Sequence, residues 1–145
     1  MNHMSVLRKY DFDLAGHISL DSNDDPVFDL AHHKFKCRTP QIYAWTVNED
    51  VVYIGMASKG IKKRLGEHKQ GWRGGSATGV AKAQLIRSAI QATGEPVKVY
   101  GRTCDSFSHT VSVLGESQTI DISLIDREED ALLKMLRPAW NVNGK

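Results

Sequence analysis

The sequence predicts an α+β domain in which helices flank a small three-stranded antiparallel sheet. Two observations support this prediction. Residues 41–55 contain two β-branched and aromatic runs joined by a short polar link, which is typical of a β-hairpin. Residues 80–93 have the apolar spacing of an amphipathic helix, and a third β-type run follows at 96–101. The 145 residues suit a single domain of this kind.

The first half of the predicted domain contains a hairpin, a helix and a loop. The hairpin consists of the strands QIYAWTV (41–47) and VVYIG (51–55), with NED as the turn between them. Residues 60–70 predict a helix with its aliphatic side chains turned inward. The glycine-rich segment GWRGGSATG (71–79) predicts a loop that leads to the next helix.

The helix predicted over 80–93 turns its apolar side chains to one side, and Gly94 is expected to end it. These side chains are Val80, Ala83, Leu85, Ile86, Ala89 and Ile90. The strand predicted at 96–101 follows this helix and would complete the sheet beside the hairpin.

The remaining segments are expected to surround this core. Residues 104–119 predict a loop or an irregular hairpin, and residues 121–138 start extended and turn helical until a proline ends the helix. Residues 1–40 carry turn signals but no clear pattern of strands. We therefore expect an N-terminal extension of unclear structure over 1–40 and a domain over 41–145, with an insertion near 102–120.

Composition and charge favour a cytoplasmic protein with a polyanionic partner. No apolar run is long enough to span a bilayer, and the N-terminal segment lacks the apolar core of a secretory signal. Cys37 and Cys104 stand far apart and outside any metal-binding spacing. The net charge is only +2, but residues 59–73 hold six Lys or Arg against one Glu. Such a cluster is typical of nucleic-acid binding, and a solvated helix face is the plainer interpretation.

Six polar side chains fall where a single site could form. The two tyrosines lie on the paired strands, the arginine and histidine are four residues apart on one helix face, and the glutamate and asparagine flank the last helix. They are Tyr43, Tyr53, Arg64, His68, Glu129 and Asn141. Taken singly, each also has an ordinary structural explanation, such as a packed tyrosine, a surface ion or a turn asparagine.

Taken together, four short motifs resemble the GIY-YIG nuclease superfamily. They are IY at 42–43, YIG at 53–55, KRLxxH at 63–68 and ExxLLxxxxPxxN at 129–141. The resemblance covers 41–101 and 121–143, and the one departure within the motifs is Gln41, which replaces the first glycine of the family name. It implies a GIY-YIG-like fold and a metal-dependent DNA endonuclease, of a restriction type or associated with a mobile element.

The resemblance also implies that the six polar side chains are catalytic, with Glu129 as the ligand of Mg²⁺ or Mn²⁺. We expect Arg64 to bind the scissile phosphate and Tyr53 to hydrogen-bond it. Our hypothesis is that Tyr43 acts as the general base and that His68 receives or relays its proton. The opposite choice of base between these two residues stays open.

Further residues are expected to contact DNA beside this site. Glycine at the end of the second strand would let the backbone approach, basic side chains would grip phosphates, and an indole would stack on a base. These residues are Gly55, Lys62, Lys63, Lys69, Trp72 and Arg73. We expect Asn141 to position Glu129 or a neighbouring phosphate. RNA as substrate, a homodimer, and a non-catalytic nucleic-acid-binding module on the same fold all stay open.

Overall fold

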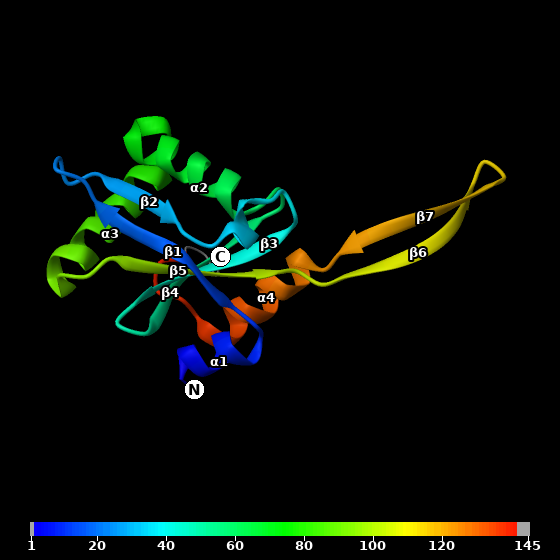
Figure 1. Ribbon diagram of the computed structural model, residues 1–145, viewed down its shortest axis with the longest axis horizontal. Coiled ribbons are helices and arrows are strands. Elements are labelled where there is room, and N and C mark those ends of the chain that lie inside the picture. Colours follow the sequence, from blue (N-terminus) through cyan, green and yellow to red (C-terminus); the bar gives the residue numbers. More distant parts are fainter. Residues whose placement is uncertain (1, 142–145) are drawn as a thin grey trace.

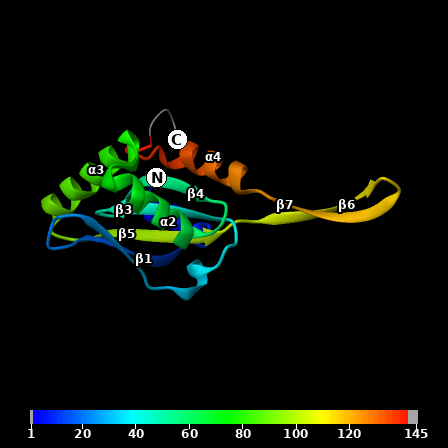
Figure 2. The same ribbon diagram turned by 90° about the horizontal axis from the view of Figure 1, so that it is seen from above.

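The computed structural model describes residues 2–141 of the chain. Its centre is a five-stranded antiparallel sheet in the order β2-β1-β5-β3-β4. The strands are β1 (Asp13–Leu20), β2 (Pro26–Leu30), β3 (Gln41–Val47), β4 (Asp50–Ala57) and β5 (Val97–Thr103). Helices cover both faces of the sheet, and a long two-stranded ribbon projects from one end of the body (Figures 1 and 2).

The predicted sheet of three strands is wrong, because β1 and β2 from the N-terminal part of the chain extend it to five. β1 pairs along the free side of β5, so β5 has a neighbouring strand on each side. The register shifts between Leu14 and Gly16, and β2 passes so close that a Cβ on Gly16 would lie 2.0 Å from the carbonyl oxygen of Asp29. This irregularity breaks the alternation of β1 and hides the strand from a sequence-based interpretation.

β3 and β4 form the predicted hairpin, and its tight turn has a clear physical reason. Asn48 and Glu49 have φ values of 50° and 68°, the left-handed conformation that type I′ turns require at both central positions. β4 continues past Gly55 to Ala57, so the predicted second strand is extended by two residues. The turn fixes the register in which Tyr43 lies opposite Gly55 and Trp45 lies opposite Tyr53.

The sheet separates two hydrophobic cores. α2 (Ile61–Gln70) and α3 (Ala77–Thr93) cover one face, and α1 (His3–Lys9) and α4 (Ile125–Leu136) cover the other (Figure 1). Because side chains alternate along a strand, β3 and β4 present different residues to each core. Tyr43, Trp45 and Tyr53 face α2 and α3, whereas Ile42, Ala44 and Ile54 face α1 and α4. Within residues 2–141, no helix is long and apolar enough to cross a membrane.

The segment between α2 and α3 is shorter than the predicted loop. A π-helical turn at Gly71–Gly75 follows α2, and the side chain of Ser76 then accepts a 3.0 Å hydrogen bond from the backbone N–H of Gly79. This cap starts α3 three residues before the predicted position. Val80 and Leu85 are exposed, so they do not lie on the buried side that the sequence predicted for them.

The predicted loop or irregular hairpin at 104–119 is a regular antiparallel ribbon. β6 (Ser106–Val113) and β7 (Glu116–Ser123) pair along their whole length and form a sheet of their own. Leu114 and Gly115 turn the chain at the tip with φ values of 52° and 85°. Both views show the ribbon extending well beyond the helices and the main sheet (Figures 1 and 2). A short 3₁₀ helix, His33–Lys36, completes the secondary structure before β3.

Candidate active site

Tyr43 is the centre of a buried polar cluster beneath α2. Its side chain is fully buried on β3, directly opposite Gly55 in the sheet register. A Cβ at Gly55 would lie 2.2 Å from the Tyr43 ring and its hydroxyl oxygen. Gly55 therefore provides the space that the phenol occupies, which gives the glycine of the YIG motif a role inside the fold.

His68 receives the hydroxyl of Tyr43 from above. The Tyr43 oxygen lies 2.5 Å from Nε2 of His68, and the histidine is 6% exposed. Burial, together with the nearby cations Arg64 and Lys82, lowers the pKa of His68 to about 3. At neutral pH the imidazole is therefore uncharged, so Nε2 accepts the hydrogen bond and Tyr43 donates it.

The protonated form of Tyr43 is stabilised in the same way. Burial raises the pKa of the Tyr43 phenol well above its ordinary value, and the neighbouring phenol of Tyr53 raises it further. The positive charge of Arg64 opposes this rise. The free protein thus holds a neutral phenol and a neutral imidazole side by side, next to a guanidinium.

Arg64 lies at the surface end of this cluster. It is one helical turn before His68 on α2, its side chain is 39% exposed, and its guanidinium is 3.4 Å from the Glu67 carboxylate. Arg64 and Glu67 together separate two surface hollows of about 440 and 160 Å³. Lys63 also lines the first hollow, and His68 lines the second. The guanidinium is thus accessible to a ligand from solvent on either side.

Lys82 is a member of the cluster that sequence reasoning missed. Its ammonium group donates a 2.8 Å hydrogen bond to the Tyr53 hydroxyl and lies 4.3 Å from the centre of that ring. It also lines the smaller hollow beside Arg64 and His68. No motif marks this lysine, because its place depends on how α3 packs against β4. The structure therefore brings together both tyrosines, His68 and two cations.

Glu129 approaches the same strands from the opposite face of the sheet. It lies four residues after Ile125 and four before Leu133, which are both buried, so it shares the apolar stripe of α4. This stripe packs against β3 and the edge strand β4. Glu129 is half-buried there. Only the edge strand β4 lies between this helix face and the side of the sheet that carries Tyr53.

Asn141 binds the backbone of β4. Its side-chain oxygen accepts from the N–H of Ile54 and its side-chain nitrogen donates to the carbonyl of Ile54, both at 2.9 Å. The N–H of Trp140 donates to the Val52 carbonyl at 2.8 Å, and the His3 ring accepts from the Val51 N–H at 2.9 Å. These contacts close the free edge of β4 and hold the strand that carries Tyr53 and Gly55.

The predicted DNA-contacting residues divide into two groups. The four basic side chains are exposed along and just after α2, where they can reach a polyanion. They are Lys62, Lys63, Lys69 and Arg73. Trp72 instead is 6% exposed and packs against Phe28 and His68, with ring centroids 4.8 and 6.0 Å away. In this structure Trp72 supports the imidazole of His68 from within the core.

The side chains present fit a magnesium-type site better than a closed metal cage. Among residues 2–141, no group of three or more His, Cys, Asp or Glu side chains converges to hold a metal ion. Mg²⁺ keeps several waters and often takes only one or two protein carboxylates together with substrate phosphates. Glu129, a half-buried carboxylate on the helix beside β4, matches that mode of binding.

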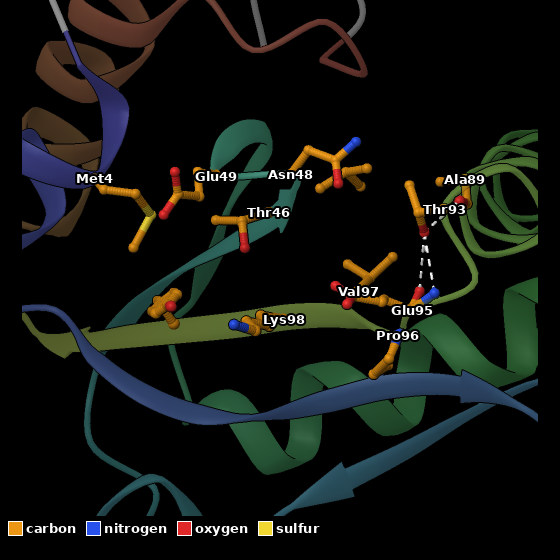
Figure 3. A pocket seen from close by; sticks show the side chains of 12 residues that line it. Met4, Thr46, Asn48, Glu49, Ala89, Thr93, Glu95, Pro96, Val97 and Lys98 are labelled. Carbon is orange, nitrogen blue, oxygen red and sulfur yellow. Dashed lines mark hydrogen bonds between the residues drawn. The ribbon is translucent and has the colours of Figure 1, made fainter.

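A separate pocket lies at the other end of the hairpin. It has a volume of about 430 Å³ and is bounded by the β3–β4 turn, the end of α3, the start of β5 and Met4 (Figure 3). Its polar side chains include Thr46, Glu49, Thr93 and Lys98. None of the predicted site residues lines this pocket, so the candidate site is the polar cluster beneath α2 and its surface hollows.

Comparison with known proteins gives one similar sequence and two similar structures. No family model matches the chain. Endonuclease II of Enterobacteria phage T4 is 34% identical over 105 residues, which cover 72% of this chain and 73% of the phage protein. The solved structure of a glutamate-to-alanine mutant of bacteriophage T4 EndoII matches with a TM-score of 0.73 and 26% identity, over 98% of this chain and 100% of that one.

The second similar structure is more distant. It is the restriction endonuclease HPY188I in complex with product DNA, with a TM-score of 0.56 and 16% identity. The match covers 90% of this chain and 76% of the restriction enzyme. At this level of identity the likeness concerns the fold alone.

Proposed function

Because this chain belongs to the family of phage T4 endonuclease II, we propose that it is a divalent-metal-dependent DNA endonuclease of the GIY-YIG type. The observation that supports this most directly is the buried hydrogen bond between Tyr43 and His68, with Arg64 and Lys82 beside it. A phenol, an imidazole and two cations that open onto surface hollows suit the hydrolysis of a phosphodiester. The EndoII fold match and the DNA complex of the distant restriction enzyme agree with DNA as the partner.

The pKa values of the free protein show why cleavage would wait for substrate. The pKa of Tyr43 is above 10 and that of His68 is about 3. A gap of more than seven units corresponds to roughly 10 kcal/mol against moving the proton from phenol to imidazole. Free Tyr43 is therefore no base, and the enzyme does not hold a reactive phenolate in the absence of DNA.

A bound phosphate would reduce this gap. An anion between Arg64 and Lys82 neutralises the two cations that lower the pKa of His68, so the imidazole becomes a better proton acceptor. Tyr43 could then give its proton to His68 and take one from the attacking water. Arg64 would hold the phosphate as charge develops on it. A divalent metal ion bound at Glu129 would supply charge stabilisation at the phosphate and the leaving oxygen.

Asn141 and the exposed basic residues would support this reaction. Asn141 would act by keeping β4 in place, since its amide is bonded to both backbone groups of Ile54. Lys62 and Lys63 would bind phosphates of the DNA backbone. Replacing both with alanine should weaken binding and lower the salt dependence of affinity by about 0.9 per lost phosphate contact. The exposed Lys134 on α4 provides a matched control that should leave affinity unchanged.

A homodimer would explain the exposed ribbon. One face of β6 and β7 carries Phe107, Ile120 and Ile122, which are 41–49% exposed, while the other face is mostly Ser and Thr. Residues 104–124 contain three acidic residues and no Lys or Arg, so this surface is a poor partner for DNA phosphates. We propose that the apolar face meets the same face of a second copy. Light scattering of Phe107→Ser with Ile122→Ser should show a smaller species than wild type, whereas Thr110→Ser should not.

The nuclease activity is tested with supercoiled plasmid in Mg²⁺, in Mn²⁺ and in EDTA. Wild type should nick or cut the plasmid only with metal, Glu129→Ala should be inactive, and Asp130→Ala should retain activity as the matched control on the same helix. Plasmid binding without cleavage in any metal would favour a non-catalytic module on this fold. Cleavage of RNA alone would change the substrate class, and equal cleavage by Glu129→Ala would remove Glu129 from the site.

A further inference from the structure

The guanidinium of Arg102 joins three elements at the base of the ribbon. Arg102 lies near the end of β5, and its side chain is only 12% exposed. Nη1 donates a 2.6 Å hydrogen bond to the carbonyl of Tyr10, at the end of α1. Nε lies 2.8 Å from Oε1 of Glu128 on α4, and Nη2 lies 3.4 Å from Oδ2 of Asp105. Each nitrogen thus contacts a different part of the chain.

The Glu128 carboxylate bridges α4 and the start of the ribbon. Its second oxygen, Oε2, accepts a 2.7 Å hydrogen bond from the backbone N–H of Asp105. The Asp105 carbonyl in turn accepts from the N–H of Leu124, at 2.8 Å, immediately before α4 begins. The two chain segments that enter and leave the ribbon are therefore fixed to each other and to Glu128.

This ion pair is largely removed from water. The Glu128 side chain is 16% exposed, and the pair lies under α1 and the ribbon base. Removing one partner of a desolvated pair leaves an uncompensated charge, so the remaining group must reorganise or move toward solvent. By contrast, the other ion pair of α4, between Lys134 and Asp130, is 78% and 63% exposed and is held only weakly.

Glu128 and the proposed metal ligand Glu129 are adjacent on the first turns of α4. Neighbouring helical positions point about 100° apart, so fixing the direction of one side chain fixes the rotation of the helix and the direction of the other. Glu128 points to Arg102 and the ribbon base, whereas Glu129 lies on the stripe that faces β3 and β4. The clamp therefore sets which way Glu129 faces.

We infer that Arg102 is a positioning residue, which orients the metal ligand Glu129 by holding Glu128 and thereby ties the metal site to the ribbon. This inference rests on the proposed function, because it takes Glu129 as the carboxylate that holds the divalent ion. Arg102 itself touches neither substrate nor metal. Its effect is expected in metal affinity, since residues that orient ligands typically change affinity on the order of 10- to 100-fold when replaced.

The test is Mn²⁺ affinity of the whole protein without DNA, measured by water-proton relaxation enhancement. Glu128→Gln keeps the size of the side chain and can still accept from Asp105, but it loses the charge that Arg102 binds. We expect its Mn²⁺ dissociation constant to rise about tenfold. The matched control Asp130→Asn removes a carboxylate one turn face away on the same helix and should leave the constant unchanged.

Thermal unfolding distinguishes positioning from a purely structural role. If Arg102 only stabilised the fold, Glu128→Gln would unfold at a lower temperature while binding Mn²⁺ as tightly as wild type below that temperature, and the inference would be overturned. Should Glu128→Gln be unfolded at the assay temperature, Arg102→Lys replaces it as the test. Lysine keeps the charge but cannot make all three contacts, so a smaller loss of affinity is expected, and an unchanged constant would again overturn the inference.

Glu129→Ala separates this inference from the function on which it rests. If wild type and Glu129→Ala bind Mn²⁺ equally, Glu129 is not the metal ligand, and both the metal assignment and the inference are wrong. If Glu129→Ala loses binding while Glu128→Gln keeps it, the metal assignment is supported and the inference alone is overturned.

Discussion

The uncharged state of His68 makes a specific prediction about stability in acid. The pKa of His68 is about 3 in the folded protein, against an ordinary value of 6.5. As pH falls below 6.5, the unfolded chain takes up a proton at this histidine that the folded protein cannot bind. The contribution of a neutral His68 to stability is therefore fully present above pH 6.5 and is lost as pH falls toward 3.

The size of the loss follows from the two pKa values. At pH 5.5 the unfolded state gains about 1.4 kcal/mol relative to the folded state, and at pH 4.5 it gains about 2.7 kcal/mol. His68 is 6% exposed, so screening by solvent reduces these figures only slightly. They are a large part of the roughly 5–15 kcal/mol that stabilises a typical domain.

Urea unfolding of wild type and His68→Gln between pH 8 and pH 4.5 measures this loss. The variant should be less stable at pH 8, because it disturbs the bond to Tyr43, but its stability should fall less with acid. The difference between the two proteins should shrink by about 2–3 kcal/mol over this range. Other titrating groups are common to both proteins and cancel. A difference that stays constant down to pH 4.5 would refute the neutral, buried state of His68.

Three further substitutions test the geometry around this cluster. Gly55→Ala should destabilise the protein by about 1–3 kcal/mol and abolish cleavage, because its Cβ would overlap the buried Tyr43 ring. Gly66→Ala, on α2 with open space at its Cβ, should instead stabilise by about 0.5–1 kcal/mol in the same thermal unfolding assay. Asn141→Asp can accept from the Ile54 N–H but cannot donate to its carbonyl, so chemical denaturation should show a loss of about 1–3 kcal/mol. Equal melting temperatures for the two glycine variants, or an Asn141→Asp protein as stable as wild type, would contradict these contacts.

Local patterns were enough to predict the hairpin and the helices. The β-branched and aromatic runs of β3 and β4, the tight turn at Asn48 and the apolar spacing of α2 and α3 all act within a few residues. The helical spacing of Arg64 and His68 likewise placed them on one helix. Whether Glu129 and Asn141 take part in catalysis is a matter for the experiments above.

What the sequence could not predict depends on contacts between distant segments. β1 is irregular near Gly16 and is recognisable only through its pairing with β5. Lys82 reaches Tyr53 only because α3 crosses β4, and Trp72 turns inward because Phe28 of β2 provides a surface for it. Each of these depends on the additional strands or on helix packing, which no local pattern encodes.

The closed edge of β4 has a consequence for the behaviour of the protein in solution. An open strand edge is a template on which other chains can add strands and polymerise. Here, side chains and backbone from both ends of the chain, His3 at one end and Trp140 and Asn141 at the other, occupy that template. A protease that clipped the chain before Trp140 would therefore leave the helices in place yet create an adhesive surface beside Tyr53. Such clipped molecules would be recognised first by aggregation, before any loss of helical structure.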